Sequence, residues 1–171
     1  MYQWPQYEWL YTVQTFPLEN NENVGRLMQN IRKLPGIILI DSPGNLVQPG
    51  LVALLTLSDR IIVPLQYEVS VMTSTIEFLR WVEAKQGITG GSSSKMLFLP
   101  NRYRNYVGTK EEREQLDDTD AALEQIGILC PKIGEHMDIQ RCQTTGLIRA
   151  QQKYVTEAFD FIYKVIAENP S

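Results

Sequence analysis

The sequence predicts an α/β protein built on a parallel sheet with helices on both faces. Three short apolar runs, at residues 37–40, 61–63 and 95–99, have the nearly continuous aliphatic character of strands that are buried on both faces. Segments with helical periodicity alternate with these runs, which favours a parallel sheet joined by right-handed crossovers. A length of 171 residues suits one domain with a sizeable core, so residues 1–171 are expected to form a single domain.

The first third of the chain contains strand and helix signals in turn. Residues 8–16 are rich in aromatic and β-branched side chains, which suit a strand. Residues 20–34 place apolar side chains on one helical face, with Asn20 or Asn21 as the expected N-cap. Pro35-Gly36 breaks that helix before the aliphatic strand that ends at Ile40, and an apolar short helix is expected at 47–57.

The rest of the chain repeats the alternation of strands and helices. The apolar face of a C-terminal helix recurs at helical spacing from Val155 to Ile166. Gly127 is expected to end the charged amphipathic helix that precedes it in the chain. In order, the expected elements are a strand at 60–65, a helix at 70–86, a loop at 87–94, a strand at 95–99, a helix at 109–126, a short strand at 128–133 and the C-terminal helix.

Composition narrows the class of protein. The net charge of −4 argues mildly against a dedicated nucleic-acid binder, although it permits a local basic patch. Cys130 and Cys142 have neither metal-like nor redox-like spacing, which is typical of unlinked thiols in a reducing compartment. The sequence contains no apolar run of membrane-spanning length, and its first residues lack the pattern of a signal peptide. We therefore expect a cytoplasmic protein with no membrane partner.

The segment Asp41-Ser42-Pro43-Gly44 carries the clearest chemical signal. It directly follows an apolar strand, and an acid at that point lies in the crevice where open α/β sheets bind ligands. In nucleotide-hydrolysing proteins an acid at this position orients Mg²⁺. The alternative is that Asp41 only caps the turn formed by the next two residues. No G-x-x-x-x-G-K-[ST] phosphate loop occurs anywhere in the sequence.

Polar residues also follow the other two predicted strands. Gln66 comes after the strand at 60–65, and Asn101 and Arg102 come after the strand at 95–99. Because parallel strands end at one edge of a sheet, Asp41, residues 64–66 and Asn101 are expected to share that edge. The alternative for each is an ordinary polar loop. Lys95, at the end of a Gly- and Ser-rich stretch, is interpreted as part of a connector, since that stretch precedes a strand instead of a helix.

The order and spacing of these segments resemble the ParA/MinD family of deviant P-loop ATPases, and the ParA partition branch most of all. The matching segments are Ile40-Asp41-Ser42-Pro43-Gly44, Val63-Pro64-Leu65-Gln66-Tyr67-Glu68, Leu99-Pro100-Asn101-Arg102, Ile133-Gly134-Glu135, Asp138-Ile139-Gln140 and Thr145-Gly146-Leu147. The resemblance covers roughly residues 35–168 and implies a P-loop NTPase-like (ParA/Soj-like) fold that is incomplete at the N-terminus. The phosphate loop, the strand before it and the helix after it have no counterpart in this sequence.

The resemblance implies roles for individual residues. Asp41 matches the catalytic acid that holds Mg²⁺ through water, and Ser42, Pro43 and Gly44 match the switch turn that senses the γ-phosphate. Asn101 and Arg102 match the pair that meets adenine. Gln66 matches a segment near the nucleotide and the dimer face. ATP and Mg²⁺ are the cofactors of a complete family member, and we expect neither to bind to this chain alone.

The expected function is that of the C-terminal portion of a ParA-like ATPase in plasmid or mobile-element DNA partitioning or transfer, without ATP hydrolysis by this chain. Its expected partners are a second copy, a partition partner protein and non-specific DNA. The cluster Arg102, Arg104, Lys110 and Arg113 either contacts DNA or forms a mixed solvated surface. The alternatives are a non-catalytic interaction module and a MinD-like regulator. The second is less favoured, because the C-terminal helix lacks a basic face.

The missing elements also imply exposed apolar surface. Unpaired strand edges and apolar faces promote association. We therefore expect either self-association or an N-terminal segment, with Trp4, Tyr7, Trp9 and Tyr11, folded over the sheet.

Overall fold

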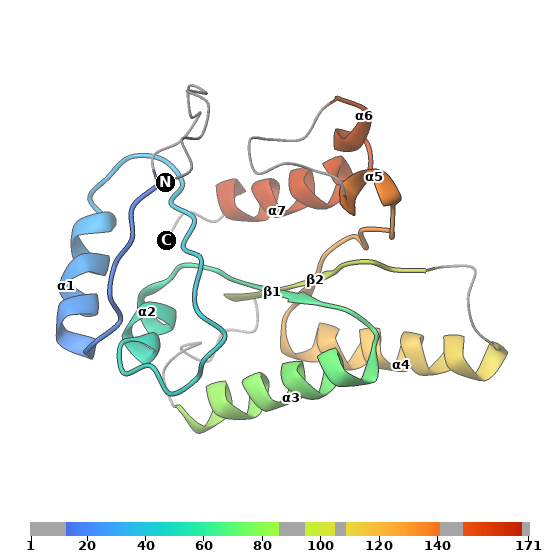
Figure 1. Cartoon of the computed structure of the whole chain (residues 1–171), viewed down its shortest axis with the longest axis horizontal. Coiled ribbons are helices and arrows are strands. Elements are labelled where there is room, and N and C mark those ends of the chain that lie inside the picture. Colours follow the sequence, from blue (N-terminus) through green and yellow to red (C-terminus); the bar gives the residue numbers. More distant parts are fainter. Residues whose placement is uncertain (1–12, 86–94, 105–108, 141–148, 169–171) are drawn as a thin grey trace, which may run out of the picture.

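The computed structural model describes residues 13–85, 95–104, 109–140 and 149–168 (Figure 1). Helices and strands alternate along much of this part of the chain. In order, the elements are α1 (Asn21–Ile31), α2 (Leu51–Leu57), β1 (Ile61–Leu65), α3 (Val69–Ala84), β2 (Met96–Pro100), α4 (Lys110–Ile126), β3 (Ile128–Leu129), α5 (Met137–Gln140), α6 (Arg149–Gln152) and α7 (Thr156–Glu168).

The three strands form one parallel sheet in the order β1-β2-β3. Ile61 pairs with Met96 and Leu65 with Pro100, so β1 and β2 begin and end at the same level. Helices α3 and α4 lie below the sheet in Figure 1, and α7 lies above it. This arrangement confirms the predicted α/β class, with a parallel sheet and helices on both faces.

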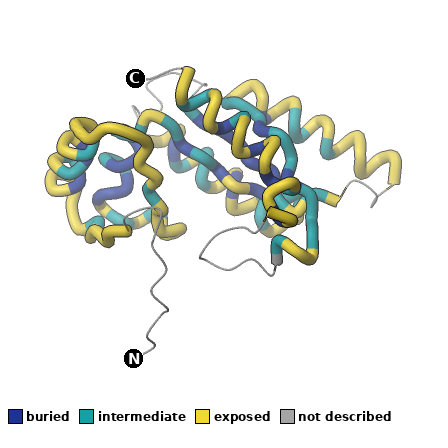
Figure 2. Tube along the Cα trace, turned by 90° about the horizontal axis from the view of Figure 1, so that it is seen from above, coloured by how far each residue is buried: buried dark blue, intermediate teal, exposed yellow. Residues whose placement is uncertain are grey.

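The alternating side chains of β2 divide the core into two clusters. Met96 and Phe98 pack with α1, α2, α3, α4 and one face of β1. Leu97 and Leu99 face the other way and pack with Cys130, Ile133 and the apolar side of α7. Both faces of this central strand are therefore covered, which explains why its sequence is continuously apolar. Figure 2 shows the buried residues on the inner sides of the helices, with exposed residues on their outer sides.

Side chains cap two of the helices. The Asn20 side chain accepts a hydrogen bond of 2.8 Å from the Asn23 amide, which confirms Asn20 as the N-cap of α1. At α4, the Thr109 hydroxyl accepts from the Glu112 amide, and the Glu112 carboxylate accepts from the Thr109 amide. This reciprocal capping box satisfies two of the donors that a helix start leaves unpaired.

The largest difference from the sequence prediction concerns residues 36–40, which do not form a strand. Within the described residues, no backbone hydrogen bond joins residues 36–44 to another segment. A strand exists only where a neighbour accepts and donates its backbone hydrogen bonds, and the aliphatic pattern alone cannot supply that neighbour. Residues 13–16 likewise form no strand, and the third strand stops at Leu129 instead of residue 133. Residues 8–12 and the predicted loop at 87–94 lie outside the described residues.

The outer edge of β1 gives a physical reason why residues 36–40 do not join the sheet there. The Leu65 carbonyl accepts a hydrogen bond from Asn101, so the polar backbone groups of Ile61, Val63 and Leu65 point toward β2. The groups of Ile62 and Pro64 therefore point away from the sheet. Because proline has no amide hydrogen, this edge offers one donor fewer to a further strand.

Candidate functional site at the carboxyl ends of the strands

The structure brings together Gln66 and Asn101, two of the predicted site residues. They directly follow the paired strand ends Leu65 and Pro100. The Asn101 amide donates a hydrogen bond of 2.8 Å to the Leu65 carbonyl, which continues the ladder one residue past the strands. Both side chains are partly exposed. This part of the predicted edge is therefore formed, at the position where α/β sheets bind ligands.

Arg102 adopts an unusual backbone conformation beside Asn101. Its φ of +54° lies in the left-handed region, and it is the one non-glycine residue with positive φ among those described. The Asn101 side chain accepts a hydrogen bond of 2.8 Å from the Arg102 amide and so stabilises the turn. A non-glycine residue in this region costs about 1–3 kcal/mol, and such residues are concentrated at functional sites.

Glu135 is the carboxylate that fixes the neighbouring arginines. Arg102 donates to it at 3.1 Å, and Arg104 donates to its other oxygen. The side chain of Glu135 is 15% exposed. Hydrogen bonding from Arg104, with a further contribution from Arg102, lowers the pKa of Glu135 below its ordinary value. The carboxylate is thus held in its charged form and ties the turn after β2 to the segment after β3.

The same contacts bear on the two interpretations of the predicted basic cluster. Arg102 and Arg104 share Glu135, and Lys110 lies 3.7 Å from Glu114. Acidic partners therefore accompany most of these cations. The structure favours a mixed surface over an uncompensated basic patch. A mixed surface offers little of the local positive field that attracts a phosphate backbone.

Sequence reasoning missed a second group of side chains at this edge. Tyr67 donates a hydrogen bond to Asp120 of α4, whose other carboxylate oxygen lies 2.5 Å from the Lys132 ammonium. That ammonium also lies 4.9 Å from the ring centroid of Tyr67 and 4.5 Å from that of Tyr103. Burial and the Asp120 carboxylate raise the pKa of Tyr67. Cation–π contacts and the ion pair together hold the turns after β1 and β2 against α4.

No spacing in the sequence identifies this group, because its members come from four separate segments. The available signal was the position of Tyr67 directly after Gln66 and of Tyr103 directly after Arg102.

The structure does not bring Asp41, Ser42, Pro43 and Gly44 to this edge. All four residues are exposed. In Figure 1 the connection from α1 to α2 lies at the left of the sheet, where β1 begins, whereas β1 and β2 end toward the right. The expectation of one shared edge is therefore wrong for Asp41. The reason is that residues 36–40 remain outside the sheet, so the residues that follow them are not at a strand end.

Metal binding has no preformed site in the described part of the chain. No group of three or more His, Cys, Asp or Glu side chains there is arranged to hold a metal ion. A magnesium ion held through water needs only one or two carboxylates besides phosphate ligands. Asp41 offers one exposed carboxylate.

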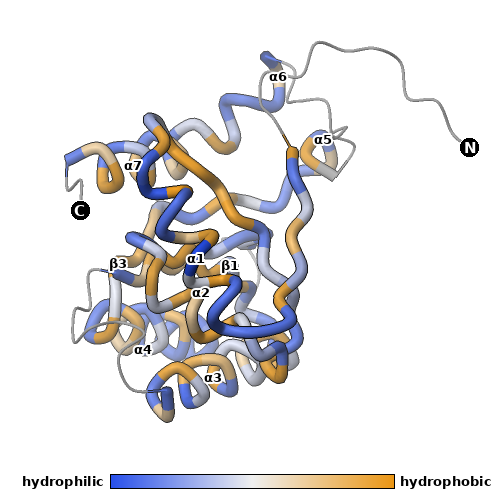
Figure 3. Tube along the Cα trace, turned by 90° about the vertical axis from the view of Figure 1, so that its left-hand side faces the viewer, coloured by the Kyte–Doolittle hydropathy of each residue, from blue (hydrophilic) through white to orange (hydrophobic). Residues whose placement is uncertain are grey.

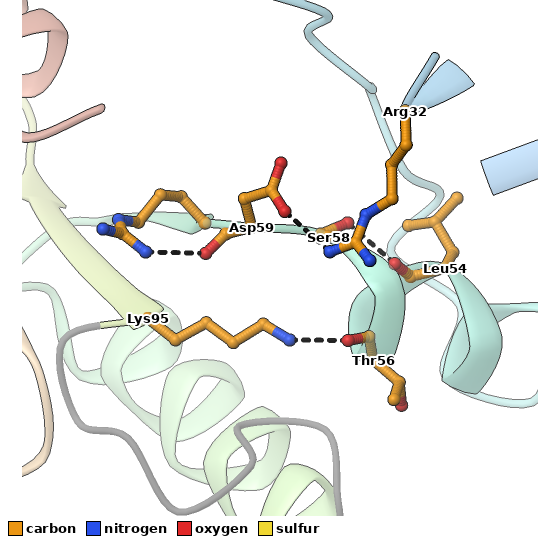
Figure 4. Close-up of polar contacts among 7 residues, drawn as sticks. Arg32, Leu54, Thr56, Ser58, Asp59 and Lys95 are labelled. Atoms are coloured by element: carbon orange, nitrogen blue, oxygen red, sulfur yellow. Dashed lines mark hydrogen bonds and ion pairs between the residues drawn. The ribbon is translucent and has the colours of Figure 1, made fainter. Parts of the chain in front are cut away.

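Lys95 has a structural role at the opposite end of the sheet (Figure 4). Its ammonium donates a hydrogen bond of 2.8 Å to the Thr56 carbonyl in the last turn of α2. Nearby, Arg32 pairs with Asp59 at 2.8 Å, and Arg60 donates to the Asp59 carbonyl. Burial lowers the pKa of Lys95, while Asp59 opposes that shift. A cation at a helix C-terminus is favourable, which agrees with the interpretation of Lys95 as part of a connector.

These features define the class of protein as α/β with a parallel sheet and a polar edge at the strand ends. Comparison with protein-family models, curated proteins and solved structures finds no match to this chain. No helix among the described residues is long and apolar enough to span a membrane.

Proposed function

We propose that this chain is the C-terminal portion of a ParA-like ATPase that acts in partitioning or transfer of plasmid or mobile-element DNA. The observation that supports this proposal is the juxtaposition of Gln66 with Asn101 and Arg102 at the ends of two parallel strands. In the proposal, Asn101 and Arg102 meet the adenine base. An amide can both donate and accept hydrogen bonds, as the edge of adenine requires.

The proposal assigns no ATP hydrolysis to this chain alone. The sequence contains no phosphate loop, so the chain lacks the backbone amides and lysine that cradle the β- and γ-phosphates. Residues 36–40 form no strand, so Asp41 and residues 42–44 do not follow a strand end in the described conformation. ATP and Mg²⁺ would bind only when another segment supplies the phosphate loop and residues 36–41 join the sheet. Dimerisation, a partition partner and non-specific DNA binding belong to that complete protein.

A second candidate function is a non-catalytic interaction module that keeps the fold without binding a nucleotide. The exposure of Asp41 and the absence of a strand at residues 36–40 favour this candidate. The two candidates differ in one respect that can be measured. Only the ATPase portion retains an adenine-recognising half-site at Asn101 and Arg102.

The test is a titration of the chain with AMP and with MgATP, followed by amide NMR and by a phosphate-release assay. We expect a saturable shift at Asn101 and Arg102 at millimolar nucleotide, no dependence on Mg²⁺ and no phosphate release. Asn101→Ala should abolish the shift. Asn45→Ala, which removes an exposed amide in the connection between α1 and α2, should leave it unchanged.

Two results would count against the proposal. The absence of any nucleotide-dependent shift would favour the interaction module. Phosphate release that Asp41→Ala abolishes would refute the expectation that the isolated chain is inactive.

A further inference from the structure

The connection between α1 and α2 contains an aliphatic run on the surface. Ile37 is 57% exposed and Leu39 is 83% exposed, whereas Ile38 is 42% exposed and Ile40 is partly buried against the core. Exposure thus alternates along the run with the period of an extended strand. In Figure 3 part of this connection is a hydrophobic stretch on the side that faces the viewer.

The backbone of the run has unused hydrogen-bonding capacity. Among the described residues, no partner pairs with the backbone groups of residues 36–44. An extended aliphatic segment with unpaired backbone groups is a template for pairing with another strand. A neighbour added here would satisfy the backbone groups and cover the exposed side chains at the same time.

We infer that a second copy of this chain covers the run by antiparallel strand pairing of residues 36–41 across a two-fold axis. The charges at the two ends of the run give the direction. The segment from Leu34 to Ile40 is uncharged, with Lys33 before it and Asp41 after it. Antiparallel pairing brings the end of one run that follows Lys33 beside the end of the other run that precedes Asp41. Parallel pairing would place like charges together, which is destabilising.

One register of this pairing fits the alternation of exposure. With Ile38 opposite Ile38 of the second copy, Ile37 lies opposite Leu39, and Leu39 lies opposite Ile37. The two most exposed aliphatic side chains then form direct cross-strand pairs on the same face. A symmetric interface of this kind closes as a dimer.

The alternative edge for association is the outer side of β1, and the structure disfavours it. Pro64 points its backbone away from β2 and has no amide hydrogen to donate. The run at 36–41 has no proline within it. The outer edge of β1 is therefore a poorer template for pairing than the run in the connection between α1 and α2.

The first experiment measures the dissociation constant by sedimentation of the full chain at micromolar concentration. We expect a monomer–dimer equilibrium. Leu39→Lys should raise the dissociation constant of the dimer at least tenfold, because the substitution places two charges in the apolar cross-strand pairs. Val69→Lys is the matched control, since Val69 is 84% exposed at the start of α3 and outside the run. This control should leave the dissociation constant unchanged.

The second experiment tests the direction of pairing by charge exchange. Lys33→Asp and Asp41→Lys should each weaken the dimer, because each brings like charges together. The double variant restores opposite charges and should recover the affinity of the unmodified chain. In a parallel pairing each substituted residue would lie beside its own copy, so like charges would remain together and neither single substitution would weaken the dimer.

Three outcomes would overturn the inference: a strictly monomeric chain, a dimer that Leu39→Lys leaves intact, or a dimer whose double charge variant does not recover. If the chain is monomeric, amide hydrogen exchange shows whether the run is open to solvent or is covered by another part of the same chain. Protection of residues 37–39 in a monomer would mean that another part of the same chain covers the run. The inference does not depend on the proposed ATPase function, because none of these measurements involves a nucleotide.

Discussion

The replacement of Gly127 by alanine tests the packing between α4 and the sheet. A methyl group at this position would lie 2.6 Å from Cε2 of Phe98 and 2.8 Å from the Met96 carbonyl oxygen. Phe98 is fully buried, and the Met96 carbonyl belongs to the central strand, so neither can move away freely. The φ of Gly127 is −172°, which any residue adopts. The requirement for glycine at this position is therefore one of space.

The expected cost of Gly127→Ala follows from that contact. Forcing one additional carbon into a well-packed core typically costs about 1–3 kcal/mol. For a protein of this size, each kcal/mol lowers the melting temperature by roughly 2–4 °C. Urea unfolding should show a lower midpoint with an unchanged m-value, since the surface exposed on unfolding stays the same.

Gly25→Ala is the matched control for this substitution. Gly25 lies within α1, and an added Cβ there would meet no atom within 4 Å. Alanine in a helix interior is favoured over glycine by about 0.5–1 kcal/mol, so this variant should be more stable than the unmodified chain. If Gly127→Ala is as stable as the unmodified chain, the close approach of Gly127 to Phe98 and Met96 is wrong.

Two further predictions concern a charged contact and a helix cap. Arginine pairing lowers the pKa of Glu135 in the folded state below its ordinary value of 4.5. The Glu135 carboxylate therefore stabilises the fold fully above pH 4.5, and this stabilisation is lost as the pH falls from there through the lower pKa of the folded state. Glu135→Gln should therefore show a smaller loss of urea midpoint between pH 6 and pH 4 than the unmodified chain. Thr109→Ala removes one half of the capping box of α4 and should cost about 1 kcal/mol by thermal or urea unfolding, whereas Thr119→Ala, within the same helix, should have a smaller effect. Equal losses for the two threonine variants would contradict the capping argument.

The predictable part of the candidate site depended on strands that did join the sheet. Residues 60–65 and 95–99 were identified as strands from their aliphatic content, and both form the parallel pair. The side-by-side position of Gln66 and Asn101 then followed, because parallel strands end at one edge. The position of Asp41 depended in the same way on residues 36–40, which lack a partner strand.

The supporting contacts of the site could not be predicted because they are not local. Glu135 is separated from Arg102 by 33 residues, and Asp120 from Tyr67 by 53 residues. Charged residues are frequent on any surface, so the sequence offers many possible pairs with no preference among them. Only the packing of α4 and of the turn after β3 against the strand ends selects these partners.

The sequence by itself determined the helices and the two central strands of this protein. Periodicity, caps and aliphatic runs are local properties, and they fixed α1, α3, α4, α7, β1 and β2 to within a few residues. The tertiary structure alone decided which of two similar aliphatic runs becomes a strand. Residues 61–65 find β2 beside them, and residues 37–40 find no neighbour among the described residues. The physical reason is that strand formation requires hydrogen bonds from a second segment, and no single segment encodes that partner.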